Sequence, residues 1–178
     1  MSIKPIYIFD GKPPLQKKET LDFRREQKQK KINERDMKLE KIKNSDLSDI
    51  EFFTLQNEIE KIEKSLIYVT PEIITNLKKL FDMLGISYIQ AKEEADTVCC
   101  QLYKDKKVSA SLSEDFDLLS RGSGKLLRDF DYKLNTFTEY NLDNILSNLS
   151  LSHTEFVDLS ILCGCDYTSK IGGIGPHT

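Results

Sequence analysis

The sequence lacks the features that would place it in a membrane or in the secretory pathway. None of its apolar runs approaches the roughly 20 residues that a membrane-spanning helix needs. Its N-terminus carries no apolar segment typical of a secretory signal. We therefore expect an intracellular protein, nuclear in a eukaryotic cell and cytoplasmic if viral or prokaryotic.

The cysteine spacing of a zinc site is also missing. Cys99 is followed directly by Cys100, Cys163 and Cys165 are two apart, and no histidine lies near either pair. All four fall in apolar helical patterns, which favours core thiols in a reducing compartment over metal ligands or disulfides. A strong positive charge is absent as well. The formal net charge of −3 argues against a uniformly basic nucleic-acid binder, although not against one whose charges are segregated.

The 178 residues suffice for one α/β domain with a core and an extra element. Alternating or continuous apolar residues predict strands, and apolar residues at 3.6 spacing predict helices. The predicted strands cover residues 6–9, 86–89, 108–112, 125–130 and 134–140. The predicted helices cover residues 17–43, 50–66, 71–84, 95–102, 141–149 and 152–162, and the helix at 71–84 has an apolar face that should pack on a core.

The helix predicted at residues 17–43 is unusually charged. It holds eleven Lys and Arg against six Asp and Glu, an excess of five positive charges in a net acidic chain. Because its apolar residues are sparse, it cannot bury a broad face, and with the helix at 50–66 it should form a hairpin beside the main domain. Such a run is usually a solvated surface, and contact with a phosphate backbone is the alternative.

Acidic residues recur at the ends of predicted strands and helices. Asp115 and Asp117 follow the strand at 108–112, and Asp10 follows the strand at 6–9. Glu94 and Asp96 open the helix at 95–102. Each has an ordinary explanation, because aspartates are common in turns and acids favour the first turn of a helix. With Asp166 near the C-terminus they form a set of six.

These six carboxylates could converge, because the carboxyl ends of parallel strands share one edge of a sheet. They could not all be ionised there without compensation. Oxygen ligands without Cys or His select Mg²⁺ or Mn²⁺, and a pair of such ions can activate a water for phosphodiester cleavage. The basic helix and a Gly-Ile-Gly turn at 173–175 would both handle phosphate. These signals together predict hydrolysis of nucleic acid.

Four motifs carry a resemblance to the flap endonucleases, a family of structure-specific 5′ nucleases. They are YIFDGKPP at 7–14, LFDMLGISYIQAKEEAD at 80–96, SEDFDLL at 113–119 and FVDLSILCGCDYTSKIGGIGP at 156–176. The resemblance implies a PIN-like α/β fold, with a mostly parallel central sheet flanked by helices and an inserted charged helical arch. It implies a nuclease core at 1–16 and 68–167, an arch at 17–67, and the start of a DNA-gripping turn at 168–178.

The resemblance also implies roles for particular residues. The metal-binding acids would be Asp10, Glu94, Asp96, Asp115, Asp117 and Asp166, with Asp10, Asp115 and Asp117 also counted as catalytic. Lys17 and Arg24, two helical turns apart, would stabilise charge on the scissile phosphate. Arg25 and the turn residues Gly173, Ile174 and Gly175 would contact DNA.

The implied activity is two-metal, Mg²⁺-dependent cleavage of DNA with a 5′ flap or a single-strand/duplex junction, in replication and repair. Mn²⁺ would substitute for Mg²⁺, and K⁺ would bind at the Gly-Ile-Gly turn. A sliding clamp is the implied partner of a longer member, although its binding peptide is not found here.

The sequence departs from the family pattern at both ends. An initial strand with a further aspartate is missing, so we expect this chain alone to be weakly active or inactive. The alternatives are a related 5′ exonuclease or excision-repair nuclease of the same superfamily, or a DNA-binding fragment without catalysis.

Overall fold

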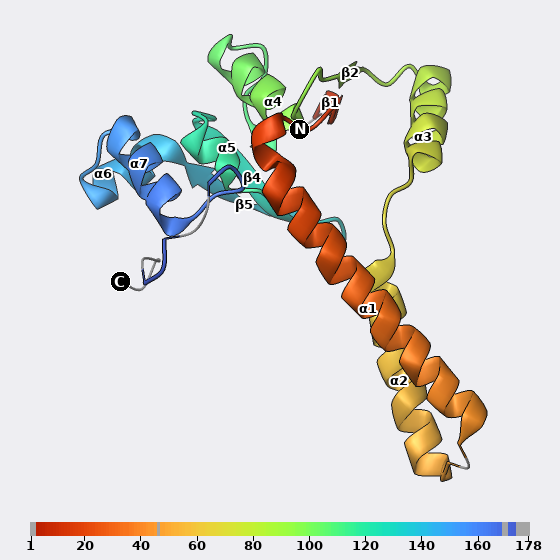
Figure 1. Ribbon diagram of the computed structural model, residues 1–178. Coiled ribbons are helices and arrows are strands. Elements are labelled where there is room, and N and C mark those ends of the chain that lie inside the picture. The colour runs from red at the N-terminus through yellow and green to blue at the C-terminus, as the bar shows by residue number, and fades with distance from the viewer. Residues whose placement is uncertain (1–2, 46, 169–170, 174–178) are drawn as a thin grey trace. The chain divides into compact units, whose positions relative to one another are not determined.

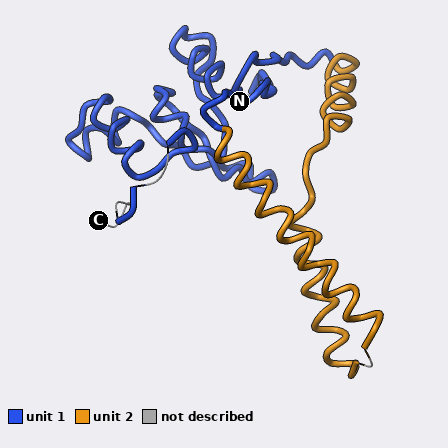
Figure 2. The backbone as a smooth tube through the Cα atoms, in the orientation of Figure 1, with its two compact units in different colours: residues 1–17, 85–178 blue, residues 18–84 orange. Residues whose placement is uncertain are grey.

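A computed structural model describes residues 3–45, 47–168 and 171–173 (Figure 1). In chain order the elements are β1 (Tyr7–Phe9), the 3-10 helix η1 (Leu15–Lys17), α1 (Lys18–Asn44), α2 (Asp49–Leu66), α3 (Pro71–Leu84), β2 (Tyr88–Gln90), α4 (Ala95–Lys104), β3 (Ser111–Leu112), α5 (Asp117–Ser120), β4 (Lys125–Asp131), β5 (Thr136–Asn141), α6 (Leu142–Leu149) and α7 (His153–Cys163). They form two compact units, one of residues 1–17 and 85–178 and the other of residues 18–84 (Figure 2).

The first unit contains two small sheets in the described part of the chain. β1 pairs in parallel with β2, so that Phe9 lies opposite Gln90. β4 pairs in parallel with β3 and antiparallel with β5, which gives the order β3-β4-β5. The strands predicted from the sequence are therefore present, although in the described residues they form two separate sheets rather than one continuous central sheet.

The core of this unit lies between the β3-β4-β5 sheet and the helices α4, α5 and α6. The core residues are Cys100, Leu118, Leu119, Leu126 and Leu142, and each is at most 6 % exposed. A buried pair of hydroxyls adds a polar contact, because Ser111 Oγ lies 2.9 Å from Ser123 Oγ. This pair ties β3 to the loop after α5, close to where the acidic residues stand.

Helix caps hold α6 and α7 in place at the end of the core. Asn141 Oδ1 accepts a hydrogen bond from the backbone N–H of Asn144 at 3.1 Å, which caps α6. Ser152 and Glu155 form the predicted capping box of α7, each side chain bonded to the other residue's backbone N–H. These bonds satisfy amide groups that would otherwise lack partners at the helix starts.

The second unit contains the charged helical hairpin that the sequence predicts. α1 and α2 lie side by side and run in opposite directions (Figure 1), with Lys31 bonded to Ser65 and Lys38 bonded to Glu58. α1 buries no residue, and α2 buries only Ile59. Charged pairs and a narrow apolar seam therefore hold the hairpin, as expected for a helix with so few apolar residues.

The predicted packing of the apolar face of α3 on a core is only partly seen. Phe81 is buried, but Leu80 and Leu84 are 47 % and 63 % exposed. The helix itself begins as predicted, with Thr70 Oγ1 accepting from the N–H of Ile73 at 3.2 Å. The 3.6-residue spacing thus predicted the helix correctly, but it could not predict how much of the apolar face is buried by other parts of the chain. No helix in the described residues has the length and apolar character needed to cross a membrane.

Leu126 tests the position of the core. It is fully buried on β4, so Leu126→Ala should reduce the free energy of unfolding by about 2–5 kcal/mol through lost contacts and a residual cavity. Leu112→Ala is the matched control in the same sheet. Because Leu112 is 62 % exposed, its truncation should cost about 0.5 kcal/mol or less. Urea unfolding of both variants measures the difference, and equal losses would contradict this core.

Candidate active site

Asp10 and the start of α4 are brought together by the parallel pairing of β1 with β2. Asp10 follows β1 directly, and its Oδ1 accepts the backbone N–H of Ala95 at 2.8 Å. The next residue, Gly11, passes so close to the loop before α4 that a Cβ there would lie 2.3 Å from the carbonyl oxygen of Lys92. Only glycine allows this approach, so the Asp-Gly sequence both turns the chain and caps the helix that carries Glu94 and Asp96.

Asp115 and Asp117 lie on the turn between β3 and α5. The N–H of Asp115 bonds to Ser113 Oγ at 3.1 Å, and Asp115 Oδ1 accepts the N–H of Asp117 at 2.9 Å. The simple interpretation of this stretch as an acidic turn is therefore correct for its backbone. It does not account for the charge, because burial and the nearby charges of Asp115 and Asp166 disfavour ionisation of Asp117 and raise its pKa.

Lys17 connects the acids at the start of α4 with the acid after α7. Its Nζ contacts Glu94 Oε1 and lies 3.2 Å from Asp166 Oδ2. The ammonium group also lies 4.9 Å from the centre of the Tyr167 ring. The side chain of Lys17 is only 15 % exposed, so these are partly buried ion pairs rather than pairs on the surface.

Arg121 is a member of the cluster that sequence reasoning missed. Its Nη2 lies 2.6 Å from Glu94 Oε2 and also contacts the hydroxyl of Tyr167, while Nη1 donates to Thr97 Oγ1 at 3.1 Å. The Tyr167 hydroxyl in turn donates to Glu94. A cation four residues after Asp117 was the only available signal, because Arg121 and Glu94 are 27 positions apart in sequence.

The raised pKa values of Asp96 and Asp117 show repulsion from neighbouring carboxylates. Burial raises the pKa of Asp96, and the charges of Asp115, Asp10 and Glu94 raise it further. Burial likewise raises the pKa of Asp117, with Asp115 and Asp166 adding to the effect. All six acids predicted from the sequence therefore lie within electrostatic range of at least one other.

Glu94 is the exception, because cations surround it. Burial alone would raise its pKa, but the hydrogen bonds from Lys17 and Tyr167 and the charges of Lys17 and Arg121 lower it. Burial would also lower the pKa of Lys17, yet its bonds to Glu94 and Asp166 hold that pKa above the ordinary value. Both groups are therefore charged at neutral pH.

Comparison with known proteins identifies the family of the chain. The family model of the XPG N-terminal domain matches residues 1–31, and that of the XPG I-region matches residues 85–166. Flap endonuclease 1 of Leishmania braziliensis is 42 % identical over 178 residues, which cover 98 % of this chain and 42 % of that protein. Flap endonuclease 1 of Tetrahymena thermophila is 40 % identical over 174 residues, with 98 % and 42 % covered. The chain belongs to the flap endonuclease family.

Solved structures of related nucleases have the same fold. Flap endonuclease-1 from Methanococcus jannaschii matches with a TM-score of 0.63 and 30 % identity, covering 97 % of this chain and 51 % of that one. The catalytic core of Rad2 in complex with DNA substrate matches with a TM-score of 0.68 and 26 % identity, covering 98 % and 45 %. The predicted 5′-nuclease fold class is confirmed. This flap endonuclease chain spans about 42 % of the length of the curated relatives.

Flap endonucleases are metal-dependent nucleases, so the fit of a metal to these acids matters. The donors are carboxylate oxygens alone, which suits a hard divalent cation. Asp96 and Asp117 have raised pKa values from burial and like charges, and a cation would relieve this repulsion. Among residues 3–45, 47–168 and 171–173, however, no three acids, histidines or cysteines stand close enough to hold an ion as they are. The residue types therefore fit a divalent metal ion. In this structure, Lys17 and Arg121 pair with Glu94, and Lys17 also pairs with Asp166.

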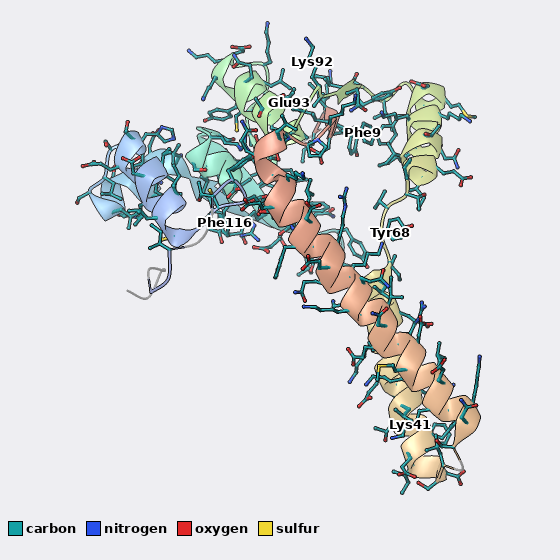
Figure 3. The ribbon with its side chains drawn as sticks, in the orientation of Figure 1. Phe9, Lys41, Tyr68, Lys92, Glu93 and Phe116 are labelled. Atoms are coloured by element: carbon teal, nitrogen blue, oxygen red, sulfur yellow. The ribbon has the colours of Figure 1, made fainter. Side chains whose placement is uncertain are left out.

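The other predicted site residues belong to the second unit, to the C-terminal turn or to residues outside the described ranges. Arg24 and Arg25 lie on α1 in the second unit, where Arg25 pairs with Asp22 at 3.0 Å. Gly173 has a left-handed backbone with φ of 82°. Ile174 and Gly175 are outside the described residues. Lys92 and Glu93, in the loop before α4, are exposed (Figure 3).

The cysteines of this flap endonuclease chain are free thiols. Cys100 is buried in the core, and the other three are half-buried. Burial raises the pKa of Cys99 to about 11, and the charge of Asp96 adds to the effect. A thiol with so high a pKa stays protonated at neutral pH, which makes Cys99 a poor metal ligand despite its position beside the acids.

Asp96 tests the electrostatic cost of the cluster. Because folding raises its pKa, the carboxyl costs no stability below the ordinary aspartate pKa, and the cost grows with pH until it is complete above the raised pKa. Asp96→Asn should therefore raise the melting temperature by a few degrees at pH 7 in EDTA, with no gain below about pH 3.5. Thermal melting across this pH range measures the effect.

Asp143→Asn is the matched control, because Asp143 is also the second residue of its helix but is exposed. It should give no gain at either pH. A loss of stability for Asp96→Asn at pH 7 would show that the acids are not in mutual repulsion.

Proposed function

We propose that this protein is a structure-specific 5′ flap endonuclease and 5′–3′ exonuclease, which hydrolyses DNA phosphodiester bonds in replication and repair. The main observation in support is the group of six neighbouring carboxylates, which come from four separate places in the sequence. Two of its members are held in electrostatically unfavourable positions. A fold keeps such a cluster readily if a cation and a charged substrate complete it. Membership of the flap endonuclease family supports the same conclusion.

The acids that would hold Mg²⁺, with Mn²⁺ as a substitute, are Asp10, Glu94, Asp96, Asp115, Asp117 and Asp166. Two bound ions would supply an activated water and charge stabilisation at the leaving oxygen. The protein's own contribution is to orient the donors. Asp10 and Asp115 are each fixed by a backbone N–H, at 2.8 and 2.9 Å, so their carboxyl planes are set before an ion arrives.

Lys17 is proposed to stabilise the charge that develops on the scissile phosphate. It is protonated over the whole neutral range, because Glu94 and Asp166 raise its pKa. Its ammonium group lies among the proposed metal ligands, where a phosphate bridging the ions would be within reach. Arg24, at the start of the charged hairpin and two helical turns further on, is proposed for the same task.

The DNA partner would carry a 5′ flap or a junction of single-strand and duplex. α1 supplies a row of basic residues, including Arg25, that suits contact with a phosphate backbone. The turn at Gly173, Ile174 and Gly175 is proposed to hold duplex DNA through K⁺. The Rad2 core, similar in fold, was solved with DNA substrate. A sliding clamp would be a partner of a longer form of the protein.

A related 5′ exonuclease or excision-repair nuclease is the second candidate function. The matches to the XPG family models and to the Rad2 core support this candidate and the first one equally. The hairpin is short, since α1 and α2 are 27 and 18 residues long, and this favours the flap or exonuclease type. Comparing cleavage of a 5′-flap duplex, a recessed 5′ end and a bubble distinguishes the candidates.

Asp115→Asn tests the proposed chemistry. On a labelled 5′-flap duplex with Mg²⁺ we expect weak cleavage by the unaltered chain and none by the variant, because a ligand oxygen is replaced by an amide. Affinity for the same DNA in Ca²⁺ should change by less than about threefold, because the contacts to phosphate remain. Gel assays of cleavage and fluorescence anisotropy of binding give the two measurements.

Two results would count against this function. Loss of DNA binding together with cleavage would assign Asp115 a structural role. Salt-dependent binding by the unaltered chain without cleavage in Mg²⁺ or Mn²⁺ would instead support a DNA-binding segment without catalysis.

Lys17→Ala tests the electrostatic role of the lysine. Loss of one preorganised charge at the reacting phosphate should slow cleavage by about 10²–10³-fold. DNA affinity should change little, and Lys17→Arg should restore part of the rate. Single-turnover rates measure the effect. Lys125→Ala is the control, because Lys125 pairs with Glu139 on the β4–β5 hairpin and is not among the proposed site residues. Similar rates for Lys17→Ala and Lys125→Ala would refute the role.

A further inference from the structure

Arg121 is the second cation of the acidic cluster, and its backbone is fixed by the end of α5. The N–H of Arg121 donates to the carbonyl of Asp117 at 3.0 Å, and the N–H of Ser123 donates to that of Leu118 at 2.8 Å. Gly122, with φ of +92°, allows this left-handed helix end. On the other side, Lys104 Nζ donates to the Arg121 carbonyl at 2.9 Å. The guanidinium therefore projects from a rigid turn.

The guanidinium reaches back to the start of α4 and is held there by several contacts. Nη2 bonds to Glu94 at 2.6 Å and Nη1 to Thr97 at 3.1 Å. The guanidinium carbon lies 5.4 Å from the centre of the Tyr167 ring. The side chains of Arg121 and Glu94 are only 25 % and 14 % exposed, so water screens their attraction weakly. This geometry fixes the position of one proposed metal ligand.

Both carboxylate oxygens of Glu94 are consequently engaged by protein groups. Oε1 contacts Lys17, while Oε2 bonds to Arg121 and Tyr167. Glu94 can therefore bind an ion through Oε2 only if Arg121 moves or shares that oxygen. The positive charge of Arg121 also lowers the pKa of the neighbouring Asp96 and Asp117, against the dominant effect of burial.

We propose that Arg121 is a built-in counter-charge of the site, which positions Glu94 and neutralises the carboxylates before divalent ions bind, and which competes with those ions. The inference rests on the proposed divalent-ion site. It assigns Arg121 a positioning role, acting through Glu94, and sets the ion affinity of the site below what the six acids alone would give. It also explains why the cluster can fold with no three acids in ligating positions among the described residues.

The expected effect of removing this charge has a definite sign. Without Arg121, repulsion among the acids rises in the ion-free state, and an incoming ion has no competitor. Arg121→Gln should therefore lower the melting temperature in EDTA while strengthening Mn²⁺ binding. For one unit charge several Å from the ions at intermediate dielectric, the gain in affinity is about three- to tenfold.

The experiment uses the full chain and Mn²⁺ as the probe. Calorimetric titration gives the dissociation constant, and thermal melting is recorded in EDTA and in saturating Mn²⁺. The melting deficit of Arg121→Gln should shrink in Mn²⁺. Arg121→Lys keeps the charge and should bind Mn²⁺ within about twofold of the unaltered chain. Lys125→Gln removes the same unit of charge outside the cluster and should leave both measurements unchanged.

The outcomes separate the inference from the proposed function. No Mn²⁺ binding by the unaltered chain would overturn the ion site itself. Unchanged or weaker Mn²⁺ binding by Arg121→Gln, with an equal melting deficit in both conditions, would leave the ion site standing and overturn the role of Arg121. If Arg121→Gln folds only in Mn²⁺, the inference is supported. If it folds in neither condition, Arg121→Lys decides, because a dissociation constant outside the twofold range overturns the inference.

Discussion

Repulsion among neighbouring carboxylates is the main electrostatic constraint on the first unit of this flap endonuclease chain. The acids come from the ends of β1, β3 and α7 and the start of α4. Asp10 and Asp115 are exposed, whereas partial burial keeps water from fully screening the other four. Lys17 and Arg121 offset the repulsion at Glu94, whose pKa is lowered. Asp96 and Asp117 remain with raised pKa values, so the compensation is incomplete. A folded chain that retains this imbalance is prepared to accept further positive charge.

The same backbone features that build the helices also place the acids. Asp10 caps α4 across the β1–β2 ladder, and Asp115 holds the first residue of α5. Both bonds satisfy backbone N–H groups at helix starts whose N-cap residues, Glu94 and Phe116, make no side-chain cap bond. Losing either aspartate would therefore change the fold locally as well as the site. This overlap explains why structure and function are best separated with isosteric amides, which keep an acceptor oxygen while removing the charge.

Much of the site could be predicted from the sequence because its signals are local. An apolar run followed by Asp10, and a Ser-rich strand followed by Asp115, mark strand ends, and parallel pairing then brings strand ends together. Arg121 could not be predicted, because its partner Glu94 lies 27 positions away and only the turn after α5 aims it there. The apolar spacing of α3 predicted a helix but not how far its apolar side chains are buried, since Leu84 is 63 % exposed. Periodicity reports which face is apolar, whereas burial depends on what packs against it.

Lys17 and Arg121 differ in how they are held against the acids. Lys17 ends a 3-10 helix directly before α1, and its compact ammonium group pairs with Glu94 and Asp166. Arg121 is planar, is anchored by backbone bonds on both sides, and donates to two side chains of α4. Under the proposed function, Lys17 would act on the substrate phosphate, whereas Arg121 would keep Glu94 in place until divalent ions take over its neutralisation.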